Sequence, residues 1–138
     1  MADQKDYSGT PLWKKLGIVE GSLVHLVGAP EGFAELLRPL TGVELVARAS
    51  KGLDVIVVFT LSEAELRKRF TSLARNLDFA GRLWVAWPKK ASKVDTDLDF
   101  GKVQSIGLDA GLVDNKSASV TDVFQGLQFV YRLKDRPR

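Results

Sequence analysis

The sequence contains no cysteine, so disulfide bonds, thiolate metal ligands and cysteine nucleophiles are excluded. Its single histidine, His25, excludes a metal centre built from several imidazoles. No apolar run approaches the roughly 18 residues that a membrane-spanning helix requires. The N-terminal stretch MADQKDYSGT lacks the apolar segment of a secretory signal peptide. These absences predict a cytoplasmic protein without a metal site and without membrane contact.

Charge of either sign is present in ordinary amounts. The 20 basic and 17 acidic residues give a net charge of +3, with basic residues concentrated in WPKKASK and in the C-terminal RLKDRPR. Nucleic-acid-binding proteins usually carry a stronger basic field, so nucleic acid is not the favoured partner. This mild excess is compatible with an anionic small molecule or a protein partner. Hydrophobic residues make up 45% of the 138-residue chain, which fits one globular domain.

Short apolar runs predict the strands of a buried sheet. Residues 23–27, 53–60 and 83–87 are almost wholly apolar, as expected for strands covered on both faces. The alternating segment VELVARA predicts an edge strand. Near the end of the chain, LVDNKSASVTD and LQFVYRLK predict two strands joined as a hairpin, with Gly126 in the turn.

Two segments carry the signals of capped helices. Ser62 and Glu65 form an S-x-x-E capping box after the second strand, and Gly81 closes that unit. A second helix is predicted from Thr96 to Ile106, where Gly107 ends it.

Weaker signals predict two shorter helical segments. One has Thr10 as its N-cap and Pro11 at its first position, and the other lies between Pro30 and Pro39.

Alternating strands and helices predict a single α/β domain over residues 1–138, with residues 1–10 as a loose arm and residues 135–138 as a basic tail. The expected architecture is a three-layer Rossmann-like sandwich. Its central sheet is mostly parallel, and the C-terminal hairpin is antiparallel. The linker SKGLD is too short for a parallel crossover between VELVARA and LDVIVVFT. Either these two form an antiparallel hairpin, or the first is too short to be a regular strand.

In such sheets, ligands bind beyond the carboxyl ends of the strands. Three segments should meet there: GAPEGF, the residues Thr60–Ser62, and WPKKAS. Glycines would allow close backbone approach, and a lysine would supply positive charge. The predicted ligand-binding residues are Gly28, Pro30, Glu31, Gly32, Trp87, Pro88, Lys89 and Ser92.

Each part of that site also has a plainer interpretation. The turn from Gly28 to Gly32 does not match G-x-G-x-x-G, and Pro30 removes one amide donor, so a tight strand-to-helix turn is favoured. Trp87 either covers a ligand or belongs to the core. Lys89 is either a site residue or a solvated lysine after a strand that ends in proline.

Other polar residues fit structural roles better than catalytic ones. His25 lies inside a predicted strand, which favours a neutral, buried histidine. The aspartates of DTDLD are expected to serve a helix N-terminus rather than a metal. Asp114 and Lys116 predict a surface ion pair. No Ser–His–Asp order, H-E-x-x-H or P-loop is present.

Four ordered motifs carry a resemblance to a known family. YSGTPLWKKLGI, LVGAPEGF, LWVAWPKKASKVDTDL and GLVDNKSASVTDVFQGLQFVYR resemble a bacterial family named domain of unknown function 3052, from Tyr7 to about Arg132. The family pattern has tryptophan at Phe124 and serine at Gln125, so this chain departs from it at the hairpin. The resemblance implies no established activity.

The order of elements is also similar to a shortened class I methyltransferase. The resemblance implies a Rossmann-like fold, whereas the glycine triplet and the acidic residue after the second strand, which hold S-adenosylmethionine in that class, are missing. Glu44 lies near the start of the expected edge strand instead.

These observations predict a non-catalytic small-ligand-binding or regulatory module, with an anion-favouring site at the carboxyl ends of the strands. No cofactor is identified, and catalysis is left undecided. One alternative is an S-adenosylmethionine-dependent methyltransferase-like enzyme. Others are a structural subunit of a complex and a nucleic-acid-binding module, the latter using Trp13, Lys14, Lys15, Trp87, Lys89 and Lys90.

Overall fold

The computed structural model of the chain describes residues 10–37, 42–48 and 50–137. The predicted N-terminal arm, apart from Thr10, therefore lies outside the described residues, as do Pro39 and the last residue of the predicted tail. No helix within the described ranges is long and apolar enough to cross a membrane.

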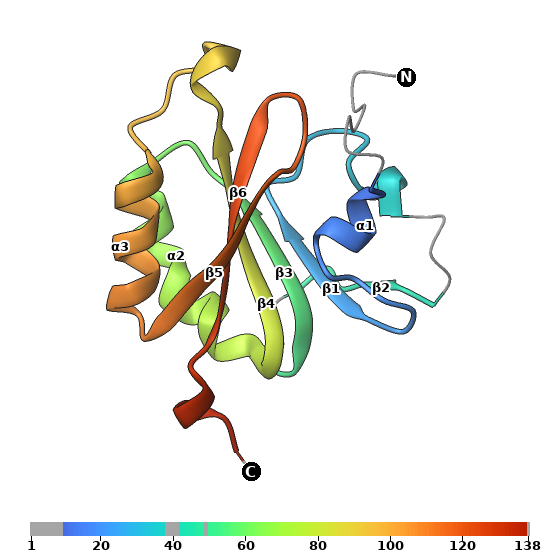
Figure 1. Ribbon diagram of the computed structural model, residues 1–138. Coiled ribbons are helices and arrows are strands. Elements are labelled where there is room, and N and C mark those ends of the chain that lie inside the picture. Colours follow the sequence, from blue (N-terminus) through green and yellow to red (C-terminus); the bar gives the residue numbers. More distant parts are fainter. Residues whose placement is uncertain (1–9, 38–41, 49, 138) are drawn as a thin grey trace.

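Six strands in the described residues form one sheet, in the order β2-β1-β3-β4-β6-β5 (Figure 1). The strands are β1 (Leu23–Val27), β2 (Glu44–Leu45), β3 (Leu53–Phe59), β4 (Leu77–Pro88), β5 (Leu112–Ser119) and β6 (Phe124–Tyr131). Neighbours from β2 to β4 are parallel, whereas β6 is antiparallel to both β4 and β5. The predicted mostly parallel sheet with a C-terminal antiparallel hairpin is confirmed.

Helices cover both faces of the sheet and complete three layers (Figure 1). The helices α2 (Glu63–Asn76) and α3 (Phe100–Asp109) lie on one face. The short helix α1 (Leu12–Lys15) and the 3-10 turn η2 (Ala34–Leu37) lie on the other. Two further 3-10 turns, η3 (Lys90–Ser92) and η4 (Leu133–Asp135), follow β4 and β6.

The central strands are apolar on both faces because each face supports its own core. On β3, Ile56 and Val58 pack with α2 and α3, while Val55 and Val57 pack with α1 and η2. All four side chains are at most 1% exposed. Burial on both sides explains why the sequence of β3 shows a continuous apolar run rather than an alternating pattern.

Trp84 of β4 fixes α1 to the sheet. Its indole is fully buried, and Nε1 donates a hydrogen bond of 3.0 Å to the carbonyl of Leu16. Pro11 is the N-cap of α1, and no side chain caps this helix. The predicted cap at Thr10 is therefore wrong by one position.

The length and position of strand β2 explain how the short linker SKGLD can lead from this strand to β3. It has two residues and pairs in parallel with the first half of β1, Leu23 with Glu44 and Val24 with Leu45. It lies on the far side of β1 from β3, so the hairpin alternative is wrong and the short-strand alternative is confirmed. Because β2 sits beside the start of β1, the chain has a short way back to the start of β3.

Several predicted element boundaries differ from the structure, and two of them concern helix α3. Helix α3 begins at Phe100 rather than Thr96, since Asp99 accepts a hydrogen bond of 2.8 Å from the amide of Lys102. Gly107 does not end α3 but lies inside it, where the ring of Phe129 occupies the space that a side chain would need.

Two further glycines lie within strands. Gly81 is inside β4, where a Cβ would approach the carbonyl oxygen of Asp54 to 2.8 Å, and the pairing of β3 with β4 shifts register at this point. Gly126 belongs to β6 and packs under Trp84, while the hairpin turn is formed by the residues before Phe124. The helix predicted between Pro30 and Pro39 is reduced to η2.

Candidate functional site

The carboxyl ends of β1, β3 and β4 meet at one edge of the sheet because these strands are parallel (Figure 1). The three segments of the predicted site follow these ends, as expected. Among the described residues, however, neither of the two pockets described below is lined by all three segments. The turn from Gly28 to Gly32 follows β1, whereas one pocket at this edge lies beyond the end of β4.

The turn after β1 combines a close backbone approach with open space. Gly28 has a φ of +67°, and a Cβ there would lie 2.9 Å from the carbonyl oxygen of Phe59. Gly32 has a φ of +85°, and a Cβ there would meet no atom within 4 Å. The amides of Ala29, Glu31 and Gly32 form no hydrogen bond with the described residues. Three N–H donors are therefore available to a ligand, although Pro30 supplies none.

An aromatic cluster lies beside this turn. The ring of Phe59, the last residue of β3, packs edge-to-face against Phe33 at 4.9 Å and against Phe124 at 5.1 Å between ring centroids. Phe33 is 2% exposed and Phe59 is 7% exposed. The turn is therefore backed by a rigid apolar wall formed by the segment after β1 and by the strands β3 and β6.

The pocket at the end of β4 has a volume of about 310 Å³. Of the predicted residues, Trp87, Pro88 and Lys89 line it, but Gly28, Pro30, Glu31 and Gly32 do not. Ser92 supports the wall, because its hydroxyl donates to the carbonyl of Lys89 at 2.7 Å. The remaining lining residues are Lys90, Lys93, Val94, Asp95, Thr96, Leu98, Asp99, Phe100 and Gln125.

Trp87 is a core residue that also reaches the pocket wall. It is 2% exposed and packs in the core shared with α2 and α3, which favours the structural interpretation of this tryptophan. Val94 and Phe100 add exposed apolar surface, at 41% and 47% exposure. The pocket therefore has an apolar side.

The charged lining of this pocket is dominated by lysine. Lys90 and Lys93 form no ion pair or hydrogen bond through their side chains with described residues, and Lys93 has a left-handed φ of 63° that closes η3. The side chain of Lys89 instead donates to Ser119 Oγ at 2.7 Å. Asp99 is occupied as the cap of α3. The unpaired lysines make the pocket favourable for an anion.

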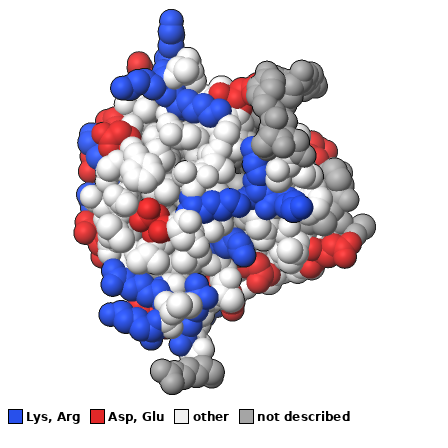
Figure 2. Space-filling model, viewed as in Figure 1, with Lys and Arg blue, Asp and Glu red and all other residues white. Residues whose placement is uncertain are grey.

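Basic side chains also gather on the face that carries α1 and the β5–β6 hairpin, with most acidic side chains nearer the rim (Figure 2). Lys15 donates to the carbonyl of Ser119 at 3.0 Å, and Lys116 donates to the carbonyl of Lys15 at 2.9 Å. The predicted ion pair between Asp114 and Lys116 is wrong, since Asp114 accepts instead from the side-chain amide of Gln104.

The other sequence-predicted polar residues have structural roles. His25 is 8% exposed, and its Nδ1 lies 2.8 Å from the carbonyl of Val46, so it is a buried histidine that holds the end of β2. Asp97 accepts a hydrogen bond of 2.8 Å from the amide of Glu63 at the start of α2. No group of metal-ligating side chains occurs among the described residues.

Sequence reasoning missed a second pocket, at the opposite edge of the sheet. It has a volume of about 360 Å³ and is lined in part by Arg82. The available signal was the arginine itself, which stands directly before the apolar run LWVAW of a buried strand.

No protein-family model and no curated protein sequence matches this chain. Solved structures match its fold. The O-methyltransferase NcsB1 from neocarzinostatin biosynthesis, in complex with S-adenosylmethionine and 2-hydroxy-5-methyl naphthoic acid, has a TM-score of 0.67 and 11% identity, over 92% of this chain and 53% of NcsB1. Magnesium protoporphyrin IX methyltransferase from Synechocystis PCC 6803 with bound S-adenosylhomocysteine has a TM-score of 0.60 and 12% identity, over 84% and 76%.

LepI in complex with S-adenosylmethionine also matches, with a TM-score of 0.64 and 13% identity, over 93% of this chain and 48% of LepI. The chain thus spans about half the length of LepI and of NcsB1. The class that the fold defines is the Rossmann-like methyltransferase fold. The resemblance to domain of unknown function 3052 stays a prediction.

The comparisons correct the functional prediction. A non-catalytic module was expected, but the matching structures include methyltransferases with bound S-adenosylmethionine or S-adenosylhomocysteine. They share the fold that the methyltransferase-like alternative predicts, and so they support that alternative better than the main prediction.

Among the described residues, the turn after β1 fits such a ligand, whereas the segment after β2 does not. The turn after β1 offers free amides, open space above Gly32 and an aromatic wall. After β2, where the resemblance implies an acidic residue, the chain has Val46, Ala47 and Arg48. Glu44 does not replace it, because Glu44 lies exposed beside the start of β1. The ligand would therefore be held by the turn after β1 without a carboxylate from β2.

Proposed function

We propose that this chain is an S-adenosylmethionine-binding protein of the methyltransferase class, with the ligand at the carboxyl edge of the sheet. The observation that carries this proposal is the turn after β1, where the amides of Ala29, Glu31 and Gly32 are free and Gly32 faces open space. Main-chain donors suit the polar groups of an adenosyl amino acid, and the wall around Phe59 suits its apolar parts. When bound, S-adenosylmethionine supplies an activated methyl group.

The pocket beyond β4 is the proposed acceptor site. Its apolar side at Val94 and Phe100, together with the unpaired Lys90 and Lys93, suits a small, flat molecule that carries an acidic group. NcsB1, which shares this fold, is complexed with an aromatic acid, 2-hydroxy-5-methyl naphthoic acid. That complex supports the same chemical class for the acceptor here.

Calorimetric titration with S-adenosylhomocysteine tests the cofactor site. The test variant is Gly32→Leu, whose side chain would occupy the open space above the turn. The matched control is Gly52→Leu, because Gly52 has a similar φ of +84° and equally open surroundings but lies at the other edge, before β3. Both variants carry the same backbone strain, so a difference between them reports on the ligand's position.

We expect wild type and Gly52→Leu to bind, and Gly32→Leu to lose about tenfold or more in affinity. Absence of binding to wild type at millimolar ligand, or equal affinity in both variants, would overturn the proposal. A parallel NMR titration with salicylate should shift the amides between Lys90 and Phe100. Shifts confined to other segments would contradict the proposed acceptor site, but they would not affect the proposed cofactor site.

A further inference from the structure

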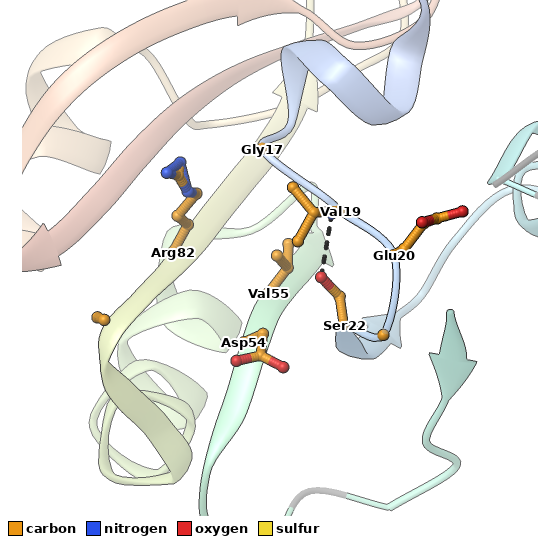
Figure 3. A pocket seen from close by; sticks show the side chains of 9 residues that line it. Gly17, Val19, Glu20, Ser22, Asp54, Val55 and Arg82 are labelled. Carbon is orange, nitrogen blue, oxygen red and sulfur yellow. Dashed lines mark hydrogen bonds between the residues drawn. The ribbon is translucent and has the colours of Figure 1, made fainter. Parts of the chain in front are cut away.

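The pocket at the amino ends of the strands is built from three separate segments. Gly17 and Ser22 come from the loop between α1 and β1, Asp54 and Val55 begin β3, and Arg82 comes from β4 (Figure 3). Its volume of about 360 Å³ is sufficient for a small organic molecule. The turn after β1 lies at the opposite edge, so this pocket is separate from the proposed cofactor site.

Arg82 is the charged member of an otherwise buried row. It pairs across the sheet with Val55 and lies in line with Trp84 and Ala86, which are fully buried on the face of α1. Figure 3 shows its side chain reaching from β4 toward Gly17. A Cβ on Gly17 would lie 2.5 Å from Arg82 Nη1, so the absence of a side chain at this position creates the space that the guanidinium occupies.

The guanidinium has no partner among the residues that the structure describes. Arg82 is half-buried and forms no hydrogen bond or ion pair with the residues that the structure describes. Asp54 is on the neighbouring strand, but its Oδ2 accepts a hydrogen bond of 2.8 Å from the amide of Leu23. Ser22 is 4% exposed, and its Oγ accepts from the amide of Val19 at 3.1 Å, which leaves the hydroxyl hydrogen able to donate.

We propose that this pocket binds a small organic anion with a single acidic group, held by Arg82 and assisted by the hydroxyl of Ser22. A guanidinium presents a planar fork of donors that matches the two oxygens of a carboxylate or of a phosphate ester. Val19 and Val55 supply an apolar wall for the rest of the molecule. The carboxylates of Glu20 and Asp54 in the lining disfavour a polyanion, so nucleic acid does not fit this pocket.

The test is an NMR titration of the full chain with benzoate and, separately, with inorganic phosphate. We expect saturable shifts of the amides of Gly17, Gly21 and Ser22 and of Arg82 Nε–H. Arg82→Gln should weaken binding about tenfold or more, because charge-assisted hydrogen bonds are lost. Arg75→Gln, which removes an exposed arginine of α2, is the matched control and should leave the affinity unchanged.

A second variant, Arg82→Lys, keeps the charge and the aliphatic stem but loses the fork, and it serves if Arg82→Gln does not fold. It should bind more weakly than wild type. A response to benzoate and not to phosphate would identify a carboxylate ligand, and the reverse a phosphate ester. Absence of shifts at Gly17, Gly21 and Ser22, whatever happens near Lys90, would overturn the proposal. Equal affinity of this pocket in wild type and both Arg82 variants would also overturn it. Because the amides of the turn after β1 are followed in the same spectra, failure here is distinguishable from failure of the cofactor site.

Discussion

At the scale of single residues, Tyr131 links two elements that the sequence does not place together. Its hydroxyl donates a hydrogen bond of 2.6 Å to the carbonyl of Ala74 near the end of α2, and its ring packs against Phe79. Ala74 O also accepts from the amide of Leu77, so it keeps one partner if the tyrosine is removed. Burial raises the pKa of Tyr131 above its ordinary value of 10.0.

Tyr131→Phe should lower the free energy of unfolding by about 1 kcal/mol at neutral pH, the usual net contribution of one hydrogen bond. The substitution should also change how the free energy of unfolding depends on pH in the alkaline range. A raised pKa means that the folded state keeps the phenol proton when the unfolded state loses it. The contribution of Tyr131 to stability is therefore complete below pH 10 and falls as pH rises from there through the folded-state pKa.

Denaturant-induced unfolding, measured at pH values from about 8.5 to 11.5, would test this effect, because this range brackets the ordinary tyrosine pKa. The wild type should lose stability more steeply than Tyr131→Phe above pH 10, since both proteins share every other titrating group. Parallel curves for the two proteins would show that the phenol is not protected in the folded state.

Local patterns succeeded where a residue's role is decided by its immediate neighbours. Ser62 caps α2 by accepting from the amide of Glu65, as the capping box predicts, and His25 is buried as its apolar run predicts. Arg82 was missed because its environment depends on Gly17, which is distant in the sequence. No local pattern records that proximity.

At the scale of elements, the start of α3 shows why boundaries were harder to predict than elements. DTDLD offers three aspartates as caps, and the structure gives Asp99 to α3 and Asp97 to α2. The second contact joins Asp97 to Glu63, which lies on a helix earlier in the chain. Local sequence therefore identifies capping residues without identifying the helix that each one serves.

The packing of α3 against β6 depends on Gly107. A methyl group there would overlap the ring of Phe129, which is fully buried and packs edge-to-face with Phe70. Gly107→Ala should lower the free energy of unfolding by about 1–3 kcal/mol through overpacking, even though alanine favours helix formation.

Gly101→Ala is the matched control in the same helix. Gly101 is exposed, and the nearest atom to an added Cβ is Asp99 Oδ1 at 3.6 Å. This change should stabilise the protein by up to about 1 kcal/mol through helix propensity alone. Urea unfolding of both variants gives the comparison, and equal stabilisation by both would show that α3 can move away from β6 without loss.

At the scale of the whole molecule, the sequence predicted the layered architecture but not which residues line each described pocket. Runs such as LDVIVVFT specify strands buried on two faces, and these specify a sheet between two helical layers. The predicted residues near Gly28 and near Trp87 do reach the same edge, yet β3 separates their strands in the sheet. Pocket shape depends on side chains from distant segments, such as Gln125 of the hairpin, and strand order alone does not fix it.

The sheet itself predicts a graded stability across the molecule. Strands β3 and β4 are paired on both sides and covered on both faces, whereas β2 is a two-residue edge whose side chains are exposed. Amides in both places are hydrogen-bonded; for example, the amide of Val46 donates to the carbonyl of Val24 at 2.7 Å. A difference in hydrogen-exchange rate between the amides of these two regions therefore reflects how easily each segment opens, because the amides in both regions are hydrogen-bonded.

Hydrogen exchange measured at increasing denaturant should separate two classes of amide. Those from Val55 to Phe59 should exchange only through global unfolding, with an opening free energy that falls as denaturant rises. The amides of Glu44 and Val46 should exchange faster, through a local opening that is nearly independent of denaturant. Equal protection of both would mean that the hydrogen bond from His25 to Val46 anchors the edge to the core.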